Sequence, residues 1–239
     1  INNSKSIEES LLLRELIHEE SITFESLISK IEKSFDFIPD KNSIINSLSV
    51  LNLNYHTLRH DKRTITYSEY IGESIANIDN NKITVTEFFK KQLLNKTFRK
   101  FLLDSTYSSI RKFKSLYKKD YYKKGFVLYR KYSRSDVLRL LGHKKEEVNQ
   151  NISGYFKAKD NSFCPIFVTY KKDEDIADTI KYQDKFLDNH ILQWESKNNR
   201  TMNSPEIVAF QTEKNIRLPL FIKKSDDEGT DHYYMGELK

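Results

Sequence analysis

The spacing of hydrophobic residues changes near Gly125, and this change constrains the fold more than any other feature of the chain. Before it, apolar residues such as Ile7, Leu11, Leu12 and Leu16 recur every three or four positions, which is the period of an amphipathic helix. After it, short runs rich in aromatic and β-branched residues alternate with turn residues, which is typical of strands. The sequence therefore predicts two domains of different structural class.

Residues 1–115 are predicted to form a helical domain. Ser6 followed by Glu9 resembles a capping box at the start of the first helix. The stretches RHDKR and DNNK have the composition of turns. They separate candidate helices, which read SIEESLLLRELIHEE, TFESLISKIEKSF, NSIINSLSVLNL, SEYIGESIANI, TVTEFFKKQLLN and TFRKFLLDSTYSSIRKFKSLYKK.

Residues 125–239 are predicted to form a second, strand-rich domain. Ser133 and Gly142 delimit one short helix, and Pro205 opens another, at the first helical position where proline is favoured. The strand candidates are SGYFKAK, CPIFVTYKK, ILQWES, IRLPLFIKK and DHYYMGELK. Five short strands with one or two helices predict a partly closed β-barrel. The expected fold class is therefore α+β, with a helical domain followed by a barrel.

Length and composition exclude several classes of protein. None of the apolar runs in these 239 residues approaches the ~20 residues that span a bilayer, so we expect no membrane segment. Cys164 is the only cysteine, so no internal disulfide can form, which is typical of a reducing compartment such as the cytoplasm. Because the sequence begins at Ile1 rather than Met, we expect it to be a piece of a longer protein.

The charge is distributed unevenly. Residues 1–95 carry 11 Lys/Arg against 14 Asp/Glu, whereas residues 96–239 carry 29 against 20. Such asymmetry indicates contact with a polyanion, although a solubility surface has the same composition. Residues 111–131 hold nine Lys/Arg and one acidic residue with interleaved aromatics, and the alternative there is a solvated linker. Basic side chains attract phosphates, so the candidate DNA-backbone ligands in this segment are Lys118, Lys119, Lys123 and Lys124.

Motifs for most catalytic chemistries are absent. The chain has no P-loop, no G-x-S-x-G and no G-x-G-x-x-G, and its six histidines are scattered, so we expect neither a zinc site nor a cofactor here. One pattern keeps an enzymatic alternative open. Asp184 with Glu195 and Lys197 resembles the D…E-x-K of metal-dependent nucleases, in which carboxylates hold Mg²⁺.

The segment from Leu128 to the end resembles the DUF3427 family. The blocks that carry the resemblance are LYRKYSRSDVLRLL, CPIFVTYKKDEDI, KYQDKFL, SPE, LFIKK and DDEGTDHYYMGE. The resemblance implies the C-terminal part of a bacterial helicase-like protein with a phospholipase-D-type nuclease on the same polypeptide. SauUSI-like ATP-dependent type IV restriction enzymes, which cut DNA containing methylated or hydroxymethylated cytosine, are the group implied. ATP and Mg²⁺ would then serve the helicase and nuclease domains, and the helical half would connect the motor to the recognition domain.

A second resemblance is to SRA domains, which flip 5-methylcytosine out of duplex DNA. Tyr182, Asp184 and Trp194 resemble the layout of their base pocket, with Tyr155 as a further candidate. The acidic residue of the SRA pattern falls at Lys185 by strict count, and the glycine-rich turn is replaced by the polar residues 195–199.

This second resemblance implies recognition of modified cytosine in double-stranded DNA by base flipping. Two aromatic faces would stack on the base, a carboxylate would accept from the cytosine amino group, and nearby polar residues would hold the DNA backbone. These residues are Lys181, Lys197, Asn199 and Arg200. Two hypotheses stay beside this one, the Mg²⁺-dependent nuclease and a basic module that docks a protein. For Tyr182 and Trp194 the alternative role is ordinary hydrophobic core.

Overall fold

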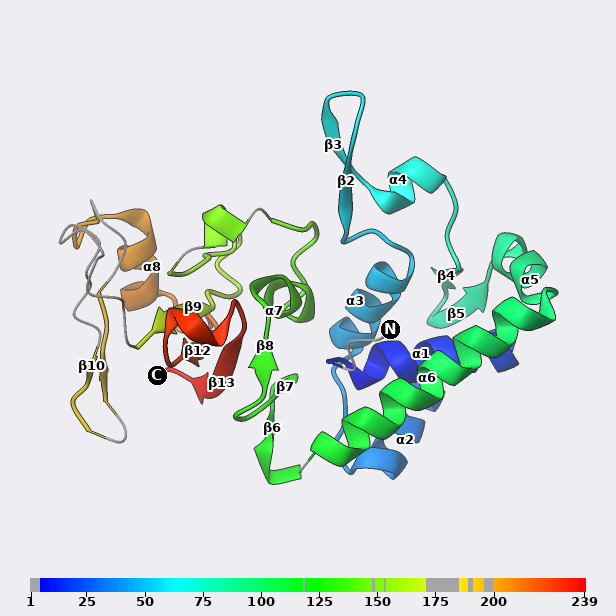
Figure 1. Cartoon of the computed structure of the whole chain (residues 1–239), viewed down its shortest axis with the longest axis horizontal. Coiled ribbons are helices and arrows are strands. Elements are labelled where there is room, and N and C mark those ends of the chain that lie inside the picture. The colour runs from blue at the N-terminus through cyan, green and yellow to red at the C-terminus, as the bar shows by residue number, and fades with distance from the viewer. Residues whose placement is uncertain are drawn as a thin grey trace. The chain divides into compact units, whose positions relative to one another are not determined.

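The computed structural model describes residues 5–117, 119–147, 149–152, 154–170, 185–188, 191–195 and 200–239. In these ranges the chain is α+β, with eight α-helices and several small separate sheets (Figure 1). The chain divides into two compact units. The first unit comprises Ile1–Val127 and Leu138–Glu146, and the second comprises Leu128–Val137 and Glu147–Lys239.

The first unit contains six helices and seven short strands before residue 128. They are α1 (Ile7–His18), β1 (Ser21–Thr23), α2 (Phe24–Phe35), α3 (Lys41–Leu51), β2 (Thr57–His60), β3 (Arg63–Thr66), α4 (Tyr67–Ile71), β4 (Ala76–Asp79), β5 (Lys82–Val85), α5 (Glu87–Leu93), α6 (Lys96–Leu116), β6 (Tyr122–Lys123) and β7 (Phe126–Val127).

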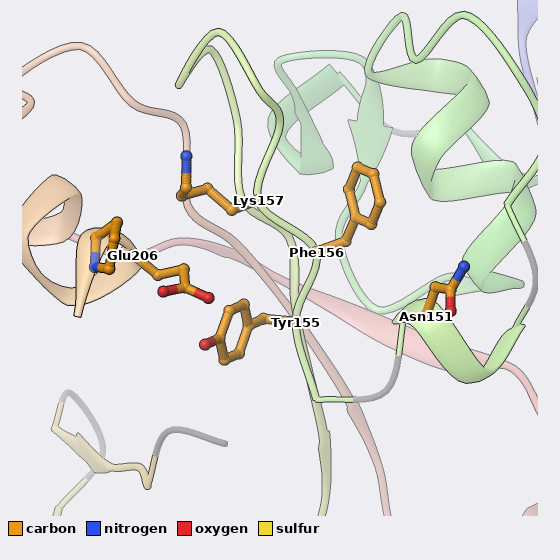
Figure 2. A pocket seen from close by; sticks show the side chains of 6 residues that line it. Asn151, Tyr155, Phe156, Lys157 and Glu206 are labelled. Carbon is orange, nitrogen blue, oxygen red and sulfur yellow. The ribbon is translucent and has the colours of Figure 1, made fainter. Parts of the chain in front are cut away.

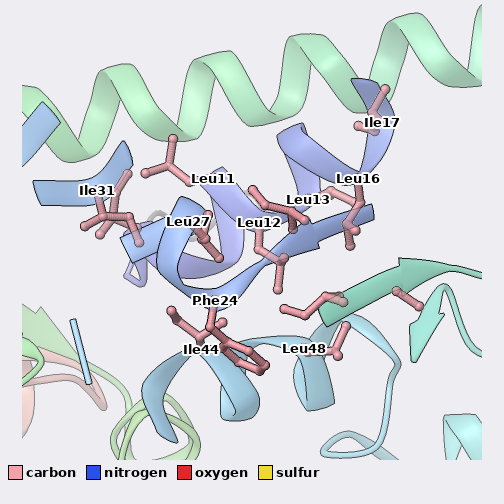
Figure 3. Packing of buried hydrophobic residues seen from close by; sticks show 14 of the residues in the cluster. Leu11, Leu12, Leu13, Leu16, Ile17, Phe24, Leu27, Ile31, Ile44 and Leu48 are labelled. Carbon is pink, nitrogen blue, oxygen red and sulfur yellow. The ribbon is translucent and has the colours of Figure 1, made fainter. Parts of the chain in front are cut away.

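Helix α1 lies at the centre of the first unit. Nine of its twelve residues are buried, because α2, α3, α6 and β1 pack around it (Figure 3). Leu12, Leu27 and Ile44 are fully buried and bring α1, α2 and α3 into one apolar cluster. Burying such side chains stabilises a fold by about 1.5–3 kcal/mol each, so α1 organises this unit.

Buried carboxylates on α1 are all hydrogen-bonded. Glu8 accepts from the Ser6 hydroxyl at 3.0 Å and from the Ser43 hydroxyl at 3.1 Å. Burial disfavours the ionised form of Glu15, but hydrogen bonds from Lys30 and Arg14 outweigh it and hold the pKa of Glu15 below its ordinary value. A central helix can therefore carry charge without leaving an uncompensated carboxylate in the core.

The prediction of a purely helical domain over residues 1–115 is wrong. A three-stranded antiparallel sheet in the order β1-β5-β4 lies in this half, with Ile22 opposite Ile83 and Ile83 opposite Ile78. The segment SEYIGESIANI contains only the last four residues of the short helix α4, which stops where Gly72 adopts a left-handed φ of 72°, and the segment then becomes β4. Strands of three or four residues are too short for their period to be distinguished from that of a helix.

Two tight hairpins in the first unit have the same backbone turn but different turn residues. Asn80 and Asn81 connect β4 and β5 with φ of 44° and 69°, and Asp61 and Lys62 connect β2 and β3 with φ of 45° and 64°. Two left-handed residues in a two-residue loop define a type I′ turn, which favours Asn, Asp and Gly. Lys62 is the residue that does not fit this preference, and a long side chain in this conformation costs roughly 1 kcal/mol.

The second unit is built on a four-stranded mixed sheet in the order β8-β13-β12-β9. Central strand β12 pairs with β13 in antiparallel and with β9 in parallel fashion, and every residue of β12 is buried. Its elements are β8 (Lys131–Tyr132), α7 (Arg134–Leu140, shared between the units), β9 (Ile166–Thr169), β10 (Lys185–Phe186), β11 (Leu192–Gln193), α8 (Pro205–Thr212), β12 (Pro219–Lys223) and β13 (His232–Glu237), with short 3₁₀ turns at Asn149–Ile152 and Asp226–Glu228.

The prediction of an SRA/PUA-like, partly closed barrel is also wrong. Strands β8 and β9 are the two outer strands of the four-stranded sheet and do not pair with each other, and β10 and β11 form a separate two-stranded ribbon. Closure into a barrel requires the first and last strands to pair with a consistent tilt and stagger. A two-residue edge strand such as β8 offers too few backbone groups for that pairing.

Several local predictions in the second unit are confirmed. The backbone N–H of Asp136 donates to the Ser133 hydroxyl at 3.0 Å at the start of α7, and Pro205 occupies the first turn of α8. The runs CPIFVTYKK, IRLPLFIKK and DHYYMGELK contain β9, β12 and β13. No helix in the described ranges is long and apolar enough to cross a membrane.

Candidate functional site

A hollow of about 400 Å³ lies beside Tyr155 in the second unit. Figure 2 shows the Tyr155 ring and the Glu206 carboxylate pointing toward one another across it. Pockets that bind small ligands have volumes of about 300–1,000 Å³ and combine aromatic walls with a few polar groups. The residues that line this hollow are Asn151, Tyr155, Phe156, Lys157, Pro205 and Glu206.

The wall that carries Tyr155 is fixed by strand β9. The Phe156 N–H donates to the Pro165 carbonyl at 3.2 Å, and the Phe167 N–H donates to the Gly154 carbonyl at 2.7 Å. Tyr155 itself forms an isolated antiparallel bridge with Ile166. Since β9 is part of the four-stranded sheet, the backbone at Tyr155 is hydrogen-bonded to the main sheet of its unit.

The opposite wall is the first turn of α8. Pro205 is the first residue of the helix and Glu206 the second, where the helix dipole favours a negative charge. The Glu206 carboxylate accepts from the Arg200 Nε at 3.1 Å, and its side chain is 22% exposed. This ion pair fixes the carboxylate while leaving part of it open to the hollow.

Arg200 connects the two walls electrostatically. Its hydrogen bond with Tyr155 and the charge of Glu206 raise the pKa of Arg200 above its ordinary value. Burial raises the pKa of the Tyr155 hydroxyl, and the hydrogen bond with Arg200 opposes that effect. The hydroxyl is therefore protonated at neutral pH.

Lys157 lies at the rim and is held by its own loop. Its ammonium donates to the Asn161 side-chain oxygen at 2.5 Å and to the Ala158 carbonyl at 3.3 Å. The rim therefore presents a positive charge at a fixed position, which suits a phosphate outside the hollow.

The structure brings together two of the predicted pocket residues, Tyr155 and Trp194, but not as two parallel faces. Their ring centroids are 5.6 Å apart with an interplanar angle of 76°. Phe210 completes the cluster, 5.9 Å from Tyr155 and 6.4 Å from Trp194. Such edge-to-face packing fills the space between rings, so no base can enter between Tyr155 and Trp194 in this arrangement.

The other predicted site residues are divided between the two units or lie outside the described ranges. Arg200 forms the ion pair with Glu206 described above. Lys119 pairs with Asp36 at 2.5 Å, Lys123 is an exposed residue of β6, and Lys124 occupies the turn that follows it, so these three belong to the first unit. The residues that lie outside the described ranges are Tyr182, Asp184, Lys181, Lys197, Asn199 and Lys118.

Most of the alternative nuclease site also lies outside the described ranges. Glu195 is exposed, while its two proposed partners, Asp184 and Lys197, lie outside the described ranges, so the structure does not test this hypothesis. Over the part of the chain that the structure does describe, no three His, Cys, Asp or Glu side chains converge as metal ligands would.

Sequence reasoning identified Tyr155 but missed the residues opposite it. Glu206 is a first-turn residue in a helix that the sequence predicts, yet nothing local indicates that it faces Tyr155. Asn151 belongs to a polar stretch without a periodic pattern, and Lys157 lies in the strand candidate SGYFKAK, where nothing local distinguishes it as a site residue. The usable signal was the Ser-Pro-Glu start of α8, because a carboxylate there has a fixed position and a defined electrostatic environment.

Comparison with known families divides the chain near the start of β7. Residues 1–126 match a family described as a domain of unknown function, DUF8090. Residues 126–239 match a second family with the same description, DUF3427, which confirms that part of the predicted resemblance. No curated protein matches the chain.

Proposed function

We propose, for a chain that belongs to the DUF8090 family and whose residues 126–239 match the DUF3427 family, that its second unit recognises modified cytosine in double-stranded DNA. The modified base, 5-methylcytosine or 5-hydroxymethylcytosine, would flip out of the duplex into the hollow between Tyr155 and Glu206. The chain would serve as the target-recognition region of an ATP-dependent type IV restriction endonuclease in the bacterial cytoplasm. ATP and Mg²⁺ would act in helicase and nuclease domains of the same polypeptide.

The observation that carries this proposal is that an aromatic residue, Tyr155, and a carboxylate, Glu206, line the same hollow of about 400 Å³. Tyr155 is only 2% exposed, so the ring would become accessible as the base enters. Extruding a base costs a few kcal/mol, and stacking on an aromatic ring returns about 1–3 kcal/mol. The Glu206 carboxylate would accept a hydrogen bond from the cytosine amino group and would repel thymine, which offers an oxygen at that position. The pair therefore selects for cytosine by polarity.

The remaining lining residues have complementary roles in this proposal. Pro205 would provide apolar contact for the added methyl group, which yields only about 1–3 kcal/mol of discrimination. Lys157 would contact a phosphate and fix the register of the duplex. Trp194 and Phe210 would support the Tyr155 ring from its edge rather than stack on the base.

A competition titration tests the proposal. Labelled duplex carrying 5-methylcytosine is bound to the chain and displaced by identical duplex that is methylated, hydroxymethylated or plain. We expect wild type to bind modified duplex more tightly than plain duplex. In Tyr155→Leu the ratio of these two affinities should fall about tenfold, because the stacking ring is gone. Tyr155→Phe keeps the ring and should keep the preference.

The carboxylate has its own matched pair of variants. Glu206→Gln is expected to weaken discrimination against a duplex with thymine at the target position, because the new amide can donate to the thymine oxygen. Asp227→Asn removes an equal charge from the exposed Asp226–Glu228 turn of the same unit and should change nothing. Equal binding of wild type to all duplexes would sink the reader hypothesis, and a preference that survives both pocket variants would exclude this hollow as the base pocket.

A further inference from the structure

The β2–β3 hairpin of the first unit extends away from the helices of that unit as a two-stranded ribbon (Figure 1). Its tip, Arg59–Arg63 in sequence RHDKR, is exposed at every residue. Three of the eleven Lys/Arg residues in the acidic stretch 1–95 lie in these five positions. Three cations against one anion, Asp61, therefore concentrate positive charge on a projecting hairpin of this stretch.

The three cations at the tip are not used within the chain. In the described ranges, the side chains of Arg59, Lys62 and Arg63 make neither an ion pair nor a hydrogen bond. By contrast, other basic residues of the unit, such as Lys30 and Lys90, pair with carboxylates. A projection that carries several unpaired cations attracts the phosphates of a nucleic-acid backbone.

Lys62 gives a second and independent indication. It occupies a left-handed position with φ of 64°, where Asn or Gly is favoured. The neighbouring β4–β5 hairpin places Asn81 at the equivalent position, with φ of 69°. A lysine retained against the conformational preference of its turn points to a role for its side chain rather than for the turn.

The base of the hairpin holds the ribbon in place. The Thr57 N–H donates to the Glu146 carboxylate at 3.4 Å, and the Lys145 ammonium donates to the Thr64 carbonyl at 3.1 Å. At the tip itself, His60 packs against Tyr70 of α4, with ring centroids 5.2 Å apart. The tip is thus presented from a fixed base, and its charge is carried on a scaffold rather than on a free tail.

We propose that the β2–β3 hairpin is a second DNA-contacting element, which inserts its basic tip into the major groove of the duplex and binds the flanking phosphates with Arg59, Lys62 and Arg63. A two-stranded ribbon fits the major groove, which is about 12 Å wide. This inference rests on the proposed function only for the identity of the partner, duplex DNA. The contact is independent of base modification, because its ligands are phosphates.

Salt-dependent binding of the full chain to unmodified duplex tests the hairpin. The variant Arg59→Gln/Lys62→Asn/Arg63→Gln is compared with Lys33→Gln/Lys82→Gln/Lys91→Gln, which removes three exposed lysine charges elsewhere in the unit. Each lost phosphate contact lowers the slope of log affinity against log salt by about 0.9. We expect the hairpin variant to lose about two to three units of slope and about tenfold in affinity, and the control to lose neither.

The single variant Lys62→Asn separates binding from folding. It removes one charge and relieves the turn, so the melting temperature should rise while affinity and salt slope fall. A wild-type slope and affinity in the triple variant would overturn the hairpin proposal while leaving the reader hypothesis standing. Failure of wild type to bind any duplex would overturn both.

Discussion

Replacing Glu9 with Gln is expected to lower the free energy of unfolding by about 3 kcal/mol at neutral pH, because it removes one partner of a buried ion pair. The Glu9 carboxylate on α1 accepts from the Arg139 guanidinium at the end of α7. The Arg139 side chain is only 6% exposed. Burial lowers its pKa to about 10, so the guanidinium is still charged at pH 7 and would lose its anionic partner. Urea denaturation followed by circular dichroism measures the change.

Two comparisons isolate the effect of burial. Glu87→Gln breaks the Glu87–Lys90 pair, whose atoms are 2.9 Å apart on the surface of α5, and should cause no measurable loss because exposed pairs contribute little. Glu9→Leu combined with Arg139→Met should recover part of the loss, since an apolar pair avoids the desolvation of charge. Equal stability of Glu9→Gln and Glu87→Gln would contradict the prediction and show that Arg139 is adequately solvated.

Glu9 also shows why local sequence gives only part of the fold. The Ser6–Glu9 spacing correctly predicted that the Glu9 N–H donates to the Ser6 hydroxyl, at 3.2 Å. It could not predict that the Glu9 carboxylate would turn to Arg139 instead of closing the capping box, because that partner is 130 residues away in sequence. Similarly, β1 is a strand only because β5 pairs with it, and three residues have no period of their own.

The candidate site has the same dependence on distant contacts. The sequence identified Tyr155 as an aromatic residue after a glycine and Trp194 as a second aromatic, and the structure places their rings in contact. Whether those rings sandwich a base or pack edge to face depends on Phe210 and the sheet beneath, which no spacing rule specifies. Glu206 meets Tyr155 because β9 and α8 belong to one unit, so the pocket is a property of topology rather than of a motif.

The second large effect concerns pH. His232 on β13 is 1% exposed and packs edge-on against Phe167, with ring centroids 5.4 Å apart. Burial, together with the positive charges of Arg134 and Lys223, lowers the pKa of His232 from 6.5 to about 4, and Asp226 only partly opposes this. Its imidazole is therefore neutral in the folded chain at pH values where the unfolded chain would protonate it.

The sign of the effect follows from proton linkage. Between pH 6.5 and pH 4 the unfolded state binds a proton that the folded state excludes, so stability falls as pH decreases through this window. Exclusion of the proton from His232 costs no stability well above pH 6.5, and it lowers the free energy of unfolding by about 2 kcal/mol at pH 5 and about 3 kcal/mol at pH 4.

Because carboxylates titrate in the same range, the measurement is the difference between wild type and His232→Gln in urea titrations at pH 7 and pH 5. His232→Gln should have lower stability at pH 7 but a shallower decline to pH 5, whereas His60→Gln, which removes an exposed imidazole, should decline like wild type. Parallel declines for wild type and His232→Gln would mean that the imidazole takes up its proton in the folded state, and the cationic surroundings of His232 would then have to open at mildly acidic pH.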